Sequence, residues 1–188
     1  KGIEILLEAI SNLPKNYFKK FCFEITGPGQ TEYVDYIKKR IIEYNISEYV
    51  KLVKPIFDKE KITYLKNADV FILPSFEEGD SIALKEAISI GIPVIISKQC
   101  RMDIVKEYNA GFVTDTKSSE VLASLLKLEK SDLQEMGNNA RILAETYYNN
   151  DDCTNRLIHI YEDLFTGNRN SPDWINKENA SSKKVFIS

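Results

Sequence analysis

The chain has 188 residues, 43% of them hydrophobic and 28% charged, and its formal net charge at pH 7 is −3. This length suffices for one domain with a substantial core, and the slightly acidic charge gives no overall attraction to nucleic acid or anionic lipid. No apolar run approaches the ~20 residues of a membrane-spanning helix, and three widely spaced cysteines favour a reducing compartment over a disulfide framework or a zinc site.

The first half of the chain alternates between helical and extended patterns. Apolar residues three and four positions apart mark one face of a helix, whereas short apolar runs bounded by glycine or proline favour strands. On this basis we expect helices over residues 3–10, 31–44 and 60–66, and strands over residues 21–26, 50–56 and 69–73. The last of these strands is expected to be buried.

The second half continues the alternation. We expect strands over residues 93–97 and 112–114, and helices or helical turns over residues 81–90, 104–107, 119–128, 131–148 and 153–165. Ser131 is expected to be the N-cap of its helix, because Gln134 three positions later completes a capping-box pattern. From residue 166 onward the composition turns polar, which predicts an irregular tail over residues 166–188. Trp174 in that tail is a candidate anchor for docking, either on a partner domain or on this domain's own surface.

Strands that alternate with helices predict an α/β fold, in which a parallel sheet carries helices on both faces. In such sheets the ligand lies in the crevice beyond the carboxyl ends of the strands. Gly27-Pro28-Gly29, Pro55 and Glu78-Gly79 each follow the carboxyl end of a predicted strand. We therefore expect these three loops on the same rim of the sheet.

Residues 74–95 hold the pattern with the most chemistry: a strand end, a polar turn, a short helix, a glycine stop and a second strand. Glu78 and Glu86 have seven residues between them, so both carboxylates can face a ligand seated above the helix N-terminus. The first backbone N–H groups of the helix have no partner inside it and form an anion site. These N–H groups belong to Asp80, Ser81, Ile82 and Ala83. A phosphate on these groups, with carboxylates nearby to accept from hydroxyls, describes a sugar-nucleotide pocket.

A series of short motifs extends this pattern over residues 1–165. In chain order they are Lys1-Gly2, Gly27-Pro28-Gly29, residues 50–56, Ala68-Asp69-Val70, Pro74-Ser75, Glu78-Gly79, Glu86-Ala87, Gly91-Ile92-Pro93-Val94-Ile95 and Ala110-Gly111. Each motif alone is weak, but their order and spacing together resemble the nucleotide-binding half of the family-four retaining glycosyltransferases of the GT-B fold.

This resemblance implies a Rossmann-like parallel sheet flanked by helices on both faces, which forms one half of a GT-B fold. Residues 1–165 are then the nucleotide-sugar-binding domain and residues 166–188 a polar tail. Such enzymes carry a further strand with an arginine, and an N-terminal domain that holds the acceptor, ahead of the position of Lys1. We therefore expect the chain to be the donor-binding part of a longer protein and to be inactive alone.

The resemblance also assigns roles to individual residues. Lys1 is expected to neutralise the donor diphosphate and Glu78 to contact hydroxyls of the transferred sugar, and these two are the expected catalytic residues. Glu86 is expected to accept from the ribose hydroxyls. The simpler readings are a frayed terminus for Lys1 and ordinary exposed glutamates for Glu78 and Glu86.

The remaining expected donor contacts come from the loops. Gly27 allows close approach of the backbone to the ligand, Val53 and Pro55 lie in the stretch that contacts the base, and the diphosphate lies on the segment Gly79, Asp80, Ser81, Ile82 and Ala83. The Asp80-Ser81 pair departs from the usual Phe-Gly. Either side chain is able to cap the helix and compete for its N–H groups, and the charge of Asp80 is unfavourable near a diphosphate unless it turns away.

By resemblance, the full-length enzyme transfers a sugar with retention from a UDP- or GDP-linked donor to a hydroxyl acceptor, in glycan or surface polysaccharide synthesis. The acceptor is lipid-linked, a glycan or a small molecule. No cofactor or metal is expected beyond the donor co-substrate, no nucleic acid partner is expected, and the location is expected to be cytoplasmic, with peripheral membrane association left open. The alternatives are a non-catalytic module that binds nucleotide sugars or a partner protein, and another GT-B enzyme such as an epimerase.

Overall fold

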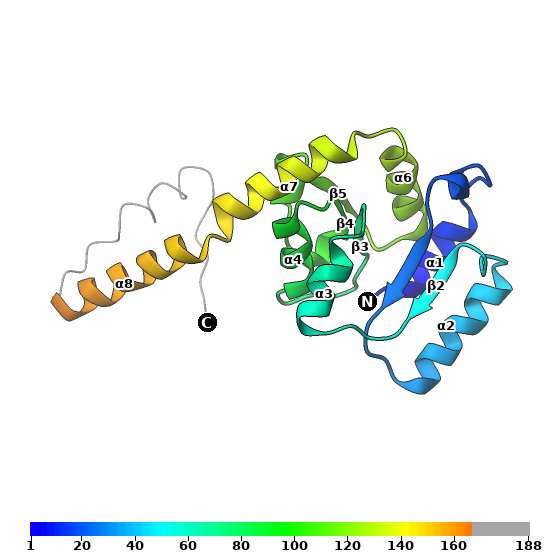
Figure 1. Ribbon diagram of the computed structural model, residues 1–188, viewed down its shortest axis with the longest axis horizontal. Helices are drawn as coiled ribbons and strands as arrows, with labels where there is room; N and C mark the ends of the chain where they lie inside the picture. Colours follow the sequence, from blue (N-terminus) through cyan, green and yellow to red (C-terminus); the bar gives the residue numbers. More distant parts are fainter. Residues whose placement is uncertain (167–188) are drawn as a thin grey trace. The chain divides into compact units, whose positions relative to one another are not determined.

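The computed structural model describes residues 1–166 of the chain (Figure 1). Lys1–Tyr147 form one compact unit, and a second unit begins at Tyr148 and contains helix α8 (Asn150–Thr166). The tail over residues 167–188, with Trp174, lies outside the described residues, so the predicted domain boundary at residue 165 stays a prediction. No helix within residues 1–166 has both the length and the apolar character needed to cross a bilayer.

The strands of the first unit form two parallel sheets. In one sheet, β1 (Phe23–Thr26) pairs with β2 (Val50–Val53). In the other, β3 (Phe71–Leu73), β4 (Val94–Ser97) and β5 (Gly111–Thr114) are neighbours in that order. Every predicted strand is therefore present, and every pairing is parallel, as the alternation with helices predicts.

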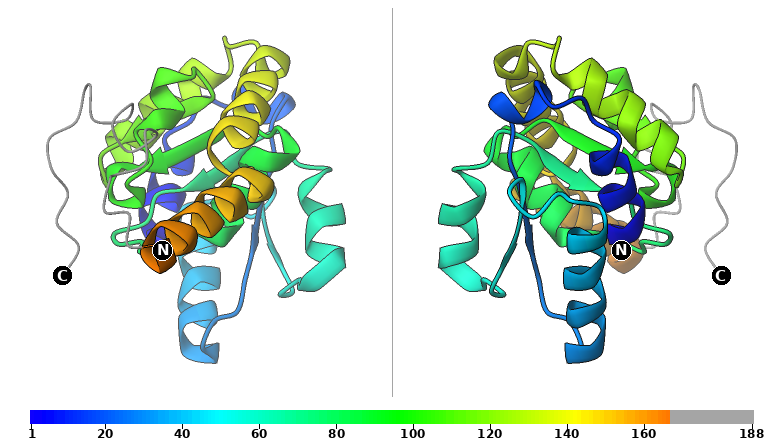
Figure 2. Two further views of the ribbon diagram at one scale, coloured as in Figure 1. Left: turned by 90° about the vertical axis from the view of Figure 1, so that its left-hand side faces the viewer. Right: turned by 90° about the vertical axis from the view of Figure 1, so that its right-hand side faces the viewer.

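The predicted helices are present as well. They are α1 (Ile3–Ser11), α2 (Thr31–Glu43), α3 (Asp58–Leu65), α4 (Ile82–Ile90), α5 (Ile104–Glu107), α6 (Ser118–Leu128) and α7 (Leu133–Tyr147). One group is formed by α1, which packs against α2 and α6, and another by α4, which packs against α3 and α7. Figure 1 and both views of Figure 2 show β1 and β2 running between α2 and α3. The α/β fold class, with helices flanking parallel sheets, is confirmed.

The expected single sheet is divided in two, and the strand order gives the reason. A doubly wound sheet has the order 3-2-1-4-5-6. The β2-β1 pair matches positions 3 and 2, and β3-β4-β5 matches positions 4, 5 and 6. In the view of Figure 1, β1 lies on the side of β2 that faces β3. No strand within residues 1–166 occupies position 1, which lies between β1 and β3. Without a strand there to pair with both, the two sheets stay separate.

The core lies where α1, α2 and α6 meet the sheets. The predicted inward positions Leu6, Leu7 and Ile10 of α1 are at most 8% exposed, and Ile37 and Ile41 of α2 are at most 6% exposed. All four residues of β4 are buried. The named side chains of α1 and α2 belong to one cluster that also includes Ile95 of β4 and residues of α6.

The predicted burial of the strand over residues 69–73 is wrong in part. The three residues of β3 are only half-buried, whereas β4 in the same sheet is buried throughout. The difference follows from position, because β4 has a neighbour on each side and β3 pairs only with β4. An edge strand leaves one side open, which an apolar run in the sequence does not reveal.

Several element ends differ from the predictions by one to three residues, and two of the differences have a clear cause. The strand expected over residues 50–56 ends at Val53, because its partner β1 ends opposite it at Thr26 and the chain turns at Gly27. The expected N-cap Ser131 is wrong, since the Asp132 carboxylate accepts hydrogen bonds from the backbone N–H groups of Gln134 and Glu135, each at 3.0 Å. A carboxylate near the helix N-terminus is also favoured by the helix dipole.

Candidate functional site

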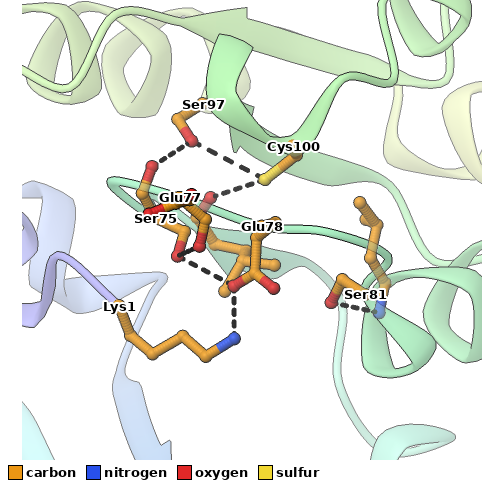
Figure 3. Close-up of polar contacts among 9 residues, drawn as sticks. Lys1, Ser75, Glu77, Glu78, Ser81, Ser97 and Cys100 are labelled. Carbon is orange, nitrogen blue, oxygen red and sulfur yellow. Dashed lines mark hydrogen bonds and ion pairs between the residues drawn. The ribbon is translucent and has the colours of Figure 1, made fainter. Parts of the chain in front are cut away.

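The loop that follows β3 is held in place by the end of β4. The Ser97 hydroxyl donates to the Ser75 carbonyl oxygen at 2.5 Å, and the buried Cys100 thiol donates to the Leu73 carbonyl oxygen at 3.6 Å. Both donors are shown with the loop in Figure 3. Because Ser75 and Ser97 are each at most 1% exposed, these bonds are shielded from water, and the loop has a defined backbone course beneath Glu78.

Glu78 lies in this loop and is only 9% exposed. Its Oε1 accepts a hydrogen bond from the Ser75 hydroxyl at 2.8 Å and forms an ion pair with the Lys1 ammonium. Figure 3 shows the Lys1 and Ser75 side chains converging on this one carboxylate. The two residues that we expect to be catalytic, Lys1 and Glu78, are therefore neighbours in space although 77 positions separate them. Lys1 contacts Glu78 and is not simply a frayed end.

Gly2 makes this contact possible. Its backbone has φ of 70°, and a Cβ atom at this position would lie only 2.0 Å from the Pro74 carbonyl oxygen. Only glycine combines the left-handed conformation with so close an approach between two backbones. The Lys1-Gly2 motif and the Pro74-Ser75 motif are thus two sides of one contact, which delivers the Lys1 side chain to Glu78.

The surroundings of Glu78 keep its carboxylate ionised. Burial raises the pKa of Glu78, but the contacts with Lys1 and Ser75 lower it by more, so that the net pKa lies below its ordinary value of 4.5. Both partners favour the charged form, since an ammonium and a hydroxyl donor each stabilise a carboxylate. At neutral pH, Glu78 is therefore a hydrogen-bond acceptor.

The lowered pKa predicts a pH dependence of stability. Because the folded-state pKa is depressed, the stability that Glu78 contributes is fully present above its unfolded-state pKa of about 4.5 and is lost as the pH falls through the lower folded-state value. Glu78→Gln should therefore flatten the acid side of the curve of unfolding free energy against pH. Denaturant unfolding from about pH 6 to pH 2.5 measures this. Glu77→Gln, at the exposed neighbouring residue, is the control, and equal acid dependence of wild type and Glu78→Gln contradicts the assignment.

Ser81 and Asp80 begin helix α4 in different ways. Ser81 is the N-cap, and its hydroxyl accepts from the Leu84 backbone N–H at 3.4 Å. Asp80 forms an ion pair with Lys85, with 2.6 Å between Oδ2 and Nζ, and this pairing compensates its charge. The capping bond uses the N–H of Leu84, which is not one of the four expected at the anion site, and the N–H groups of Ile82 and Ala83 make no bond to any described residue. The cap therefore leaves the N–H groups of Ile82 and Ala83 open to an anion.

Glu86 projects from α4 toward α3 rather than standing alone. Its Oε2 lies 2.5 Å from Nζ of Lys61, and the two side chains are 27% and 31% exposed. Glu86 is thus not an ordinary exposed glutamate. Lys61 is a residue that the sequence reasoning missed, because nothing in the pattern of a short polar helix indicates a partner 25 positions away.

The predicted base-contacting stretch lies at the carboxyl ends of β1 and β2. The Thr26 hydroxyl donates to the Lys54 carbonyl oxygen at 3.0 Å, so the chain segments after the two strands are tied together. Val53 is half-buried and Pro55 is exposed beside this link. Gly27 has φ of 148°, and no atom lies within 4 Å of the place a Cβ would take. Open space beside Gly27 leaves room for a ligand to approach its backbone.

Two hollows of the described structure lie away from Glu78 and Glu86. One, of about 440 Å³, runs along α3 and is lined by Ile56, Lys59, Glu60, Thr63, Tyr64 and Asn67. A second, of about 170 Å³, lies between α7 and the segments that lead into β3 and β4. Neither of these two hollows is lined by Glu78 or Glu86. Within residues 1–166 no cluster of three or more histidine, cysteine, aspartate or glutamate residues is placed to hold a metal ion.

Comparison with known sequences gives one family and a consistent set of relatives. The family model described as "Glycosyl transferases group 1" matches residues 1–143. The amylovoran biosynthesis glycosyltransferase AmsK of Erwinia amylovora is 30% identical over 174 residues, which cover 87% of this chain and 42% of that protein. The putative colanic acid biosynthesis glycosyltransferase WcaL of Escherichia coli strain K12 is 27% identical over 177 residues, with the same coverages of 87% and 42%. The chain thus spans less than half the length of these relatives.

Solved structures resemble the fold. Sucrose-phosphate synthase from Thermosynechococcus elongatus gives a TM-score of 0.74 at 22% identity, covering 89% of this chain and 43% of that one. Anabaena Alr3699/HepE, solved in complex with UDP, gives a TM-score of 0.71 at 18% identity, covering 85% of this chain and 44% of that one. At such identities the likeness establishes the fold alone.

Proposed function

The chain belongs to the glycosyl transferases group 1 family, and we propose that it is the donor-binding domain of an enzyme that transfers a sugar from a nucleoside diphosphate to a hydroxyl acceptor with retention. Its fold is that of one half of a GT-B glycosyltransferase. The observation that carries the proposal is the cluster of Lys1, Ser75 and Glu78 beside the start of α4, because it joins a cation, an ionised acceptor and free helix N–H groups.

Each part of this cluster suits one part of the donor. An ammonium has three N–H donors, so Lys1 keeps two for the diphosphate while one contacts Glu78. The N–H groups of Ile82 and Ala83 lie at the start of α4, where the helix dipole favours negative charge. As the sugar leaves, charge develops on the diphosphate, and these fixed donors would stabilise it.

Glu78 suits the transferred sugar. Its Oε1 is occupied by Lys1 and Ser75, and its Oε2 makes no hydrogen bond within residues 1–166. That oxygen remains for a sugar hydroxyl, and the carboxylate fixed by two partners would orient the sugar without further ordering. Gly27, Val53 and Pro55 would contact the base, and Glu86 the ribose. Anabaena Alr3699/HepE has been solved with UDP and with UDP-glucose, which supports a nucleoside diphosphate as the ligand.

The proposed acceptor is a glycan of a surface polysaccharide. AmsK and WcaL are named for amylovoran and colanic acid biosynthesis, and both descriptions favour a growing polysaccharide over a small molecule. In the proposal, a second domain supplies the acceptor, and the cleft between the two domains excludes water from the transfer.

A titration with nucleotides tests the proposal. Ligand-observed NMR of this chain with UDP and GDP should show binding of one of them. Glu86→Ala should weaken it by about 1–3 kcal/mol, the cost of losing a charged hydrogen-bond partner. Binding that is unaffected by Glu86→Ala, or absent for both nucleotides, contradicts the proposal.

A non-catalytic module that binds nucleotide sugars is a second candidate. The Ser81 cap favours it, because the hydroxyl takes the Leu84 N–H, the next donor along the helix after the four expected at the anion site. Ser81→Gly frees that N–H at a cost of about a few tenths of a kcal/mol in helix stability. If the protein is an enzyme, a polypeptide that contains both this domain and the acceptor domain should transfer sugar with Ser81 unchanged. A protein that binds the donor but transfers no sugar favours the module.

A further inference from the structure

Lys61 lies on α3 at the edge of the proposed ribose site, and no role has been assigned to it above. Its ammonium is the one partner of Glu86 within residues 1–166, at 2.5 Å. The contact joins α3, which follows the proposed base-contacting stretch, to α4, which bears the proposed phosphate site. The ion pair therefore connects the elements on the two sides of the nucleotide.

The two oxygens of Glu86 are not equivalent. Oε2 is fully covered, and it makes no hydrogen bond to a described residue, so the Lys61 ammonium is its whole compensation. Such a covered oxygen is out of reach of a ribose hydroxyl. Oε1 makes no hydrogen bond within the described residues, and it is the atom left for a ligand. Lys61 thus pairs with Oε2, which the ribose cannot reach, and leaves Oε1 for the ribose hydroxyls.

We propose that Lys61 is a positioning residue, which holds Oε2 of Glu86 so that Oε1 faces the ribose hydroxyls of the donor. This inference rests on the proposed donor-binding function. A free glutamate side chain has several rotatable bonds, and their freedom is lost when it binds a ligand. With Oε2 fixed by Lys61, that loss is already incurred in the absence of the donor, so the ribose binds a preorganised acceptor.

An alternative role for Lys61, as a group that blocks Glu86, predicts the opposite change in nucleotide affinity. If Lys61 blocked Glu86 and had to be displaced by the ribose, its removal would free the carboxylate and tighten binding. If Lys61 positions Glu86, its removal leaves a mobile carboxylate with an uncompensated, covered oxygen, and binding weakens. The sign of the change therefore separates the two.

The test is the affinity of the chain for the nucleoside diphosphate that the wild type binds, UDP or GDP, and for its 2′-deoxy analogue, by isothermal titration calorimetry. Lys61→Met keeps an unbranched side chain only one atom shorter and removes its charge. It should weaken binding of the ribose nucleotide about tenfold and binding of the deoxy analogue much less. The preference of the chain for the ribose nucleotide therefore falls. Lys61→Arg should restore most of the affinity. Adding Lys61→Met to Glu86→Ala should cause no further loss, because Lys61 acts only through Glu86.

Lys59→Met is the matched control, since Lys59 is an exposed residue of the same helix and forms no ion pair with a described residue. It should bind like the wild type. Thermal unfolding of each variant shows whether it is folded. Unchanged or tighter binding by Lys61→Met, or an equal loss of ribose and deoxyribose nucleotides, overturns the inference. Failure of the proposed function is distinct, because the wild type itself would then bind neither UDP nor GDP.

Discussion

Replacing Gly2 by alanine is expected to separate Lys1 from Glu78 and to destabilise the domain. The added Cβ would lie 2.0 Å from the Pro74 carbonyl oxygen, in a backbone with φ of 70° that alanine rarely adopts. The start of α1 must then move away from the loop after β3, which breaks the ion pair at Glu78. We expect a loss of about 2 kcal/mol in unfolding free energy, from the left-handed strain and the steric overlap together.

Chemical denaturation measures this loss, and Gly79→Ala is the control. Gly79 lies in the same loop as Glu78, and no atom is within 4 Å of the place its Cβ would take, so alanine should be tolerated there. Gly2→Ala should also flatten the acid dependence of stability, because Glu78 loses its cation. A Gly2→Ala protein that matches Gly79→Ala in both stability and pH dependence contradicts the described contact.

Gly111→Ala is expected to have the larger effect on the fold. A Cβ at Gly111 would lie 2.0 Å from the carbonyl oxygen of Val94, its cross-strand partner in the β4–β5 ladder. No flexible side chain relieves this overlap, so β5 must move from β4, which is buried throughout. We expect a loss of about 3 kcal/mol, enough to unfold a marginally stable domain.

Urea unfolding monitored by circular dichroism tests this prediction. Gly29→Ala is a suitable comparison, because the nearest atom to its Cβ is a flexible side-chain methyl of Val34 at 3.2 Å, and only a small change is expected. If Gly111→Ala unfolds at the same urea concentration as Gly29→Ala, the close approach of β5 to β4 is not as described.

The helices and strands were predictable because local signals agree with the fold. The apolar spacing in α1, the glycine stop after α4 and the buried run of β4 each depend on neighbouring residues in sequence. The cap at Asp132 in place of Ser131 is a local error of one residue, but two other failures depend on partners far away in the sequence. The end of β2 at Val53 is set by the end of β1, and the half-burial of β3 by its place at an edge. Neither the end of β2 nor the burial of β3 can be predicted from the residues next to it in the sequence.

The site shows the same division. Glu78 and Glu86 stand out because a carboxylate pair about a helix start has a recognisable spacing, and Ser81 was foreseen as one of two candidate caps. Lys61 was not, since its pairing with Glu86 arises from the packing of α3 on α4. The donors that hold the loop, Ser75 and Ser97, are small polar residues whose roles emerge only when two strand ends meet.

The central claim is that a nucleoside diphosphate binds across the loops after β1, β2 and β3. Chemical-shift mapping on the ¹⁵N-labelled chain during titration with UDP and GDP tests it most directly. The account predicts the largest shifts at the backbone N–H groups of Gly27, Gly79 and Ala83. Shifts confined to the hollow along α3, at residues such as Thr63 and Asn67, would contradict it, as would a spectrum that neither nucleotide changes.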